Sequence, residues 1–213
     1  MNLDYVPLLR IMRELHGIPR GQPPDFNGMK RFRHFVRRIF PRKKNGEIDE
    51  NAVYLIPLLA INPMAKDHVT ALLDAYLAMD ADGIGARVAA EVAARLADVP
   101  GDLKVGLVVV DDLMGGGSNR YDCEFFFRFG PNQLGGGSTP PKPFHWVKEF
   151  WLAGVLWSSE VATERAVREA ILTAAHRRAY LHRHGPARTL RELLAQEGQV
   201  MAAAGCSGPT LDA

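Results

Sequence analysis

Residues 103–110, LKVGLVVV, constrain the fold more than any other stretch of this sequence. The aliphatic run from Val105 to Val110 is too short for a typical helix, and two aspartates follow it directly. Such a run predicts a strand that is buried on both faces. We therefore expect a sheet inside the core of the protein.

A second strand is predicted over residues 121–129. Every second side chain there points to the same face of a strand, and this set is mostly aromatic: Tyr121, Cys123, Phe125, Phe127 and Phe129. Because the loop between the two strands is too short for a crossover helix, we expect them to pair antiparallel. With residues 150–157 as a third strand, the sequence predicts a small, largely antiparallel sheet of three or four strands.

Apolar residues at helical spacing account for most of the remaining chain. The predicted helices cover residues 4–15, 29–40, 63–79, 84–97, 158–184 and 189–204. We expect Ser158 or Ser159 to cap the long helix, and Thr189 with Glu192 to form a capping box for the last one. Glycines or prolines follow several of these segments, as is typical of helix ends.

The predicted fold is a single α+β domain over residues 1–213, mostly helical and built around the small sheet. Its parts are an N-terminal helical segment that includes a basic amphipathic helix, a helical region, a sheet region and C-terminal helices: 1–47, 48–99, 103–157 and 158–205. With 213 residues, 47% of them hydrophobic, the chain can bury a sizeable core.

Composition favours a cytoplasmic protein. The two cysteines, Cys123 and Cys206, form no disulfide framework or CxxC pair. The first residues lack the basic and then apolar order of a secretion signal, and no apolar run reaches the ~20 residues of a membrane span. A net charge of +2 indicates that the chain as a whole is not a polyanion binder.

The loop after residue 110 is the first candidate site. Asp111 and Asp112 are the candidate catalytic residues, as acid and base or as metal ligands, and Ser118, Asn119 and Arg120 are candidate ligand-binding residues. The loop has no phosphate-binding fingerprint, so a solvated hairpin loop is the alternative. Its GGGS recurs at 135–138, which leaves open whether these tetrapeptides are native or engineered linkers.

A basic segment over residues 30–44 is the second candidate site. Its predicted partner-binding residues are Lys30, Arg33, Arg37, Arg38, Arg42 and Lys43. Clustered cations can bind nucleic acid without sequence specificity, an acidic protein surface or anionic lipid. The alternative is a helix that packs on the core through its phenylalanines and exposes a solvated basic face.

Metal-dependent and nucleophilic chemistry have weaker support. The seven histidines show no HExxH or other metal spacing: His16, His34, His68, His145, His176, His182 and His184. Cys123 is expected to be a small buried residue, and no GxSxG elbow is present for a serine nucleophile. The sequence predicts no metal site and indicates no particular cofactor or oligomeric state.

Two functional hypotheses follow. The first is a non-catalytic intracellular binding or assembly protein that contacts an anionic partner through the basic segment at 30–44. The second is an enzyme that acts on a small polar or phosphorylated substrate at the loop of residues 111–120. Because no complete catalytic motif is present, the sequence favours the first hypothesis slightly.

Overall fold

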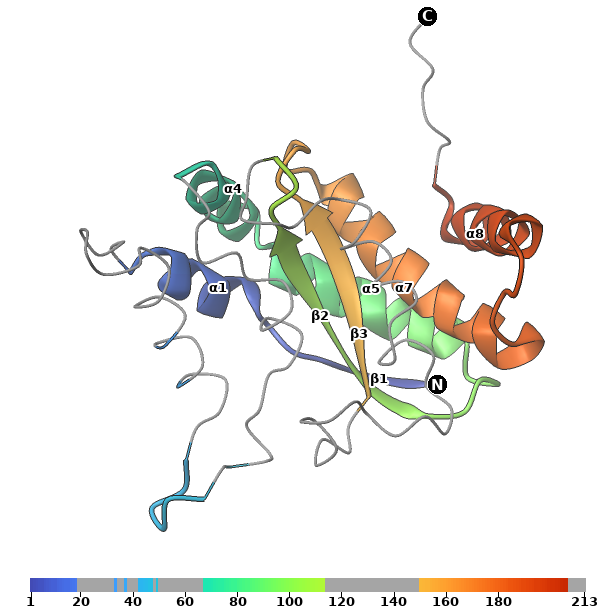
Figure 1. Ribbon diagram of the computed structural model, residues 1–213, viewed down its shortest axis with the longest axis horizontal. Helices are drawn as coiled ribbons and strands as arrows, with labels where there is room; N and C mark the ends of the chain where they lie inside the picture. The colour runs from blue at the N-terminus through green and yellow to red at the C-terminus, as the bar shows by residue number, and fades with distance from the viewer. Residues whose placement is uncertain are drawn as a thin grey trace, which may run out of the picture.

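The computed structural model describes residues 1–18, 33, 37, 42–47, 49, 67–113 and 150–206, with Phe150 described in its backbone only. These residues form a sheet and five helices in the following chain order (Figure 1): β1 (Asn2–Tyr5), α1 (Leu9–His16), α4 (Asp67–Ala78), α5 (Ala81–Arg95), β2 (Asp102–Val110), β3 (Phe150–Trp157), α7 (Glu164–His184) and α8 (Leu190–Ala204). No helix in these ranges is both long and apolar enough to cross a bilayer.

The described sheet is entirely parallel, so the predicted antiparallel sheet is wrong. Its strand order is β1-β2-β3, and β2 pairs with both neighbours in the parallel sense. β3 runs beside β2 from the pair Leu103 and Phe150 to the pair Val110 and Trp157. The strand predicted at 121–129 lies outside the described residues.

The connections explain why the sheet is parallel. Parallel neighbours need a crossover of about a dozen residues or more. Helices α1, α4 and α5 lie between β1 and β2, and residues 111–149 lie between β2 and β3, so both connections are long enough. The antiparallel prediction assumed that β2 pairs with the next apolar stretch in the sequence, but the strand that pairs there is β3.

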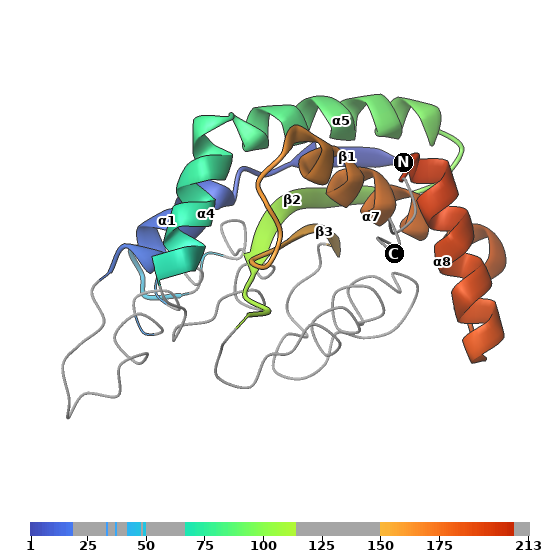
Figure 2. The same cartoon turned by 90° about the horizontal axis from the view of Figure 1, so that it is seen from above.

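The helices α5 and α7 lie against each other and contact the sheet, α5 at β1 and β2 and α7 at β3 and β2 (Figures 1 and 2). A glycine in β3 allows close packing on this face. A Cβ atom at Gly154 would lie 3.0 Å from Ile171 Cδ1 and 3.0 Å from Leu107 Cδ2. The core between helices and sheet is therefore filled by aliphatic side chains in direct contact.

The N-terminal residues form a strand where a helix was predicted. β1 occupies Asn2–Tyr5, and α1 begins only at Leu9. The hydroxyl of Tyr5 donates a 2.8 Å hydrogen bond to Asp82 on α5, and the nearby backbone amides of Leu8 and Leu9 lower the pKa of the same carboxyl group. Asp82 thus joins β1 to α5 beside the start of α1, where the Leu8 side chain forms no cap.

The C-terminal helices mostly match the sequence, with one correction. The capping box of Thr189 and Glu192 is confirmed at the start of α8, which ends at Gly205 with a φ of 69°. α7 begins after Thr163, whose side chain accepts the amide of Ala166, so neither Ser158 nor Ser159 caps it. The two serines instead contact the residues that follow β2.

Candidate functional site

The carboxyl ends of β2 and β3 bring polar side chains together. In a parallel sheet the strands end at the same edge, which is where open α/β proteins bind ligands. β2 is followed by Asp111 and Asp112, and β3 by Ser158 and Ser159. The first turn of α4 adds His68, and α4 lies near this end of the sheet (Figure 1).

Asp111 is the buried centre of this group, with 2% of its surface exposed. His68 Nε2 lies 2.9 Å from Asp111 Oδ1, and the Ser158 hydroxyl donates to the same oxygen at 2.9 Å. The backbone amide of Leu113 also donates to it at 3.3 Å. Asp111 therefore joins three elements of the fold at one carboxylate.

The environment of Asp111 favours its ionised form. Burial is the largest influence and by itself raises the pKa, but the hydrogen bonds from His68 and Ser158 and the nearby imidazole charge lower it. The net effect is a pKa below the ordinary value for aspartate. Asp111 is thus a carboxylate at neutral pH, and it is a hydrogen-bond acceptor for the imidazole.

Asp112 connects the ends of β2 and β3. Its Oδ2 accepts the Ser159 hydroxyl at 2.7 Å, and its Oδ1 accepts the Ser159 amide at 2.9 Å. The Ser158 hydroxyl lies 3.1 Å from Asp112 Oδ1 and accepts the Asp112 amide at 3.1 Å. These contacts fix the position of the turn after β3, so Asp112 joins this turn to the end of β2.

His68 is the side chain at this site that can still react with a substrate. Its side chain is 29% exposed, and its Nδ1 makes no hydrogen bond within the described part of the chain. An imidazole whose Nε2–H donates to a buried carboxylate carries its lone pair on Nδ1, where it can accept a proton. Because the Ser158 hydroxyl donates to Asp111 and not to His68, the geometry does not form a serine–histidine nucleophile pair.

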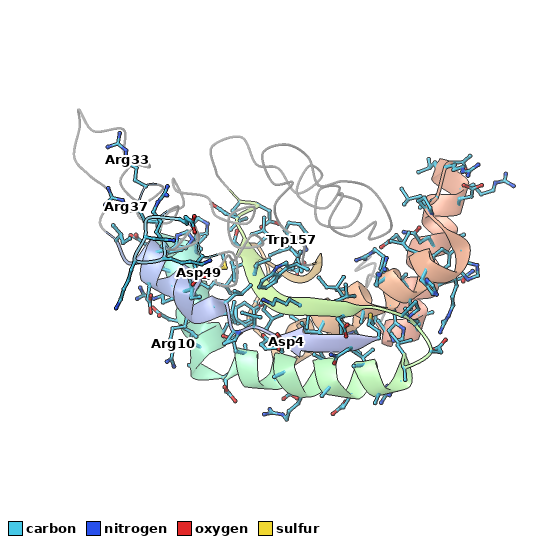
Figure 3. All side chains as sticks on the ribbon, turned by 90° about the horizontal axis from the view of Figure 1, so that it is seen from below. Asp4, Arg10, Arg33, Arg37, Asp49 and Trp157 are labelled. Carbon is cyan, nitrogen blue, oxygen red and sulfur yellow. The ribbon has the colours of Figure 1, made fainter. Side chains whose placement is uncertain are left out.

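The other predicted site residues are only partly described. Ser118, Asn119 and Arg120 lie outside the described residues, as do Lys30 and Arg38. Arg33 and Arg37 are exposed and lie in helical backbone, on one side of the molecule (Figure 3). Arg42 and Lys43 are exposed as well, and Arg42 donates to the carbonyl of Gly46 at 2.6 Å.

Sequence reasoning identified Asp111 and Asp112 but missed His68, Ser158 and Ser159 as site residues. The serines would have been found if the sheet had been predicted as parallel, since residues that follow neighbouring parallel strands lie side by side. No motif marks His68, which is 43 positions from Asp111 and belongs to the start of a helix.

A cavity of about 360 Å³ lies apart from these residues, between α1, the end of α4 and the start of α5. Its lining includes Arg10, Glu14, Asp80 and Asp82. The Asp82 carboxylate already accepts the Tyr5 hydroxyl at 2.8 Å. We therefore place the candidate site at the strand ends, where a ring nitrogen is available for chemistry, and not in this cavity.

Among the residues that the structure describes, no three histidine, cysteine or acidic side chains are placed to hold a metal ion. Comparison of the chain with protein-family models, with curated proteins and with solved structures gave no match. We therefore infer the function from the geometry at the strand ends.

Proposed function

We propose that the protein is an enzyme in which His68 acts as a general base on a small polar substrate at the carboxyl ends of β2 and β3. The supporting observation is the 2.9 Å contact between His68 Nε2 and the buried carboxylate of Asp111. A positioned general base contributes about 10²–10⁴-fold to a reaction rate. The proposed function requires a rate contribution of this size from His68.

Each neighbouring residue has a separate role in this proposal. Asp111 orients the His68 ring, selects its tautomer and stabilises the imidazolium that forms when Nδ1 accepts a proton. Asp112, Ser158 and Ser159 hold the ends of β2 and β3 together. Asp111 therefore acts through His68, and we no longer assign it the direct acid–base role considered from the sequence.

Hydrolysis of activated esters tests the proposal without knowledge of the natural substrate. The probes are p-nitrophenyl acetate and p-nitrophenyl phosphate, which distinguish acyl from phosphoryl transfer. We expect turnover of one probe, and a loss of about 10²-fold or more in kcat/KM in His68→Gln. His182→Gln, at an exposed position in the last turn of α7, is the matched control and should behave like wild type.

Two results would refute this function. One is the absence of turnover with both probes. The other is turnover that His68→Gln leaves unchanged, because the hydrolysis would then occur without the proposed base.

A second candidate function is the capture of an anionic partner by the basic segment. It is favoured by the exposed guanidinium groups of Arg33 and Arg37, which are four residues apart and so share one face of helical backbone. Fluorescence anisotropy with a labelled single-stranded oligonucleotide tests it. Binding that falls with salt and is lost in the Arg33→Glu, Arg37→Glu double variant would support it, whereas equal binding by both proteins would exclude it.

A further inference from the structure

The hydroxyl of Tyr76 is a buried polar group that has no role in the function proposed for His68. Tyr76 lies on α4 and has 0% of its surface exposed. Within the described residues its hydroxyl has no hydrogen-bond partner. Buried polar groups in folded proteins are nearly always hydrogen-bonded, so an unpaired one suggests that a ligand supplies the partner.

Tyr76 and His68 are carried by the same helix. Eight residues separate them, which is about 12 Å along the helix axis at 1.5 Å per residue. Side chains in a helix tilt toward its N-terminus, which is the end of α4 that carries His68. At 3.6 residues per turn, the two side chains leave the helix about 80° apart. Both residues thus belong to one helix whose first turn reaches the strand ends.

Glu160 follows β3 closely in the sequence, and its charge acts on Tyr76. Burial raises the pKa of Tyr76 to about 12, and the nearby negative charge of Glu160 adds to the effect. Glu160 comes directly after Ser158 and Ser159, which hold Asp111 and Asp112. The turn and α4 lie near each other in both ribbon views (Figures 1 and 2).

We propose that the Tyr76 hydroxyl is a second substrate-contacting group of the strand-end site and donates a hydrogen bond to an acceptor oxygen of the substrate. This inference rests on the function proposed for His68. The phenol is protonated at neutral pH, so it is a donor and not a base. A hydrogen-bond donor at the site suits a substrate with a carbonyl or ester oxygen, on which negative charge develops when the base activates water.

Tyr76→Phe removes only the hydroxyl, and Tyr5→Phe is its matched control. The Tyr5 hydroxyl has a partner, Asp82, at 2.8 Å, whereas that of Tyr76 has none in the described structure. We expect Tyr76→Phe to unfold at the same temperature as wild type or higher, and Tyr5→Phe to unfold at a lower one. With p-nitrophenyl acetate, kcat/KM should fall about 10-fold or more in Tyr76→Phe and stay unchanged in Tyr5→Phe.

Two outcomes would overturn the inference. If Tyr76→Phe is as destabilised as Tyr5→Phe, its hydroxyl has a structural partner. If Tyr76→Phe keeps full kcat/KM while His68→Gln loses it, the inference fails and the proposed function stands. If His68→Gln also keeps full activity, the proposed function itself fails, so the two failures are distinguishable.

Discussion

The imidazole of His68 and the carboxylate of Asp111, 43 positions apart in the sequence, lie 2.9 Å apart at the end of the central strand. The first turn of α4 supplies the ring, and the residue after β2 supplies the carboxylate. The Ser158 hydroxyl at the end of β3 contacts the same oxygen. This arrangement depends on a parallel sheet, because the carboxyl ends of neighbouring strands lie at the same edge only when the strands are parallel.

Asp111→Asn should lower the free energy of unfolding at pH 7 by about 1–3 kcal/mol, the cost of disturbing a buried hydrogen-bonded group. The folded-state pKa of Asp111 is below its ordinary value, so its contribution is present above the unfolded-state pKa. It is lost as the pH falls through the folded-state pKa. Urea unfolding should therefore show a difference between variant and wild type at pH 7 that shrinks by pH 3, and an equal difference at both would contradict the prediction.

Tyr5→Phe should lower the free energy of unfolding by about 1.5–3 kcal/mol at pH 7, as expected for the loss of a hydrogen bond to a charged group. Burial raises the pKa of Asp82, and the bond from Tyr5 lowers it. Because the folded-state pKa of Asp82 is above the unfolded one, stability falls as the pH rises between them. Removal of the Tyr5 hydroxyl raises this pKa further. Urea unfolding should therefore show a larger loss of unfolding free energy in Tyr5→Phe at pH 7 than at pH 4.

Gly85 and Gly198 both lie inside helices, and substitution of each by alanine tests whether Tyr5 packs closely on α5. A Cβ atom at Gly85 in α5 would lie 2.7 Å from the Tyr5 hydroxyl, whereas one at Gly198 in α8 has no atom within 4 Å. Gly198→Ala should raise the free energy of unfolding by about 0.5–1 kcal/mol through helix propensity. Gly85→Ala should lower it by about 1–3 kcal/mol, as in overpacking. A gain in both variants would show that Tyr5 does not pack on α5.

The ion pair of Arg177 and Glu197 holds α8 on α7. Arg177 Nη2 lies 2.8 Å from Glu197 Oε2, and the two side chains are 5% and 15% exposed. Glu197→Leu alone should cost about 3–5 kcal/mol, because it leaves a buried guanidinium without its partner. Adding Arg177→Met should recover much of that loss. A double variant that is no more stable than Glu197→Leu would contradict this interpretation.

Local sequence patterns predicted much of the fold. The strand at 105–110, the strand at 150–157 and the capping box of Thr189 and Glu192 are all present in the structure. Each depends on neighbours in the sequence: a short apolar run for each strand and a short-range cap for α8. Gly17 and Gly205 also end helices where the sequence indicates.

The errors have a common physical cause, which is that long-range pairing is not visible in local patterns. Residues Asn2–Tyr5 gain their strand conformation from pairing with β2, although Tyr5 also matches the apolar spacing of the helix predicted from Asp4. The strand sense was wrong because the nearest apolar stretch in the sequence was taken as the partner of β2. His68 was missed for the same reason, since only the folded chain brings it to Asp111.

Long-range ¹H–¹⁵N correlation spectra show which nitrogen of the His68 ring is protonated, and they therefore test whether Asp111 prepares His68 to act as a base. With Nε2 facing the Asp111 carboxylate, the neutral ring should carry its proton on Nε2 and leave Nδ1 unprotonated. Asp111→Asn should weaken this preference. A wild-type ring protonated on Nδ1, or a mixture of tautomers that Asp111→Asn leaves unchanged, would contradict the claim that Asp111 prepares His68 to act as a base.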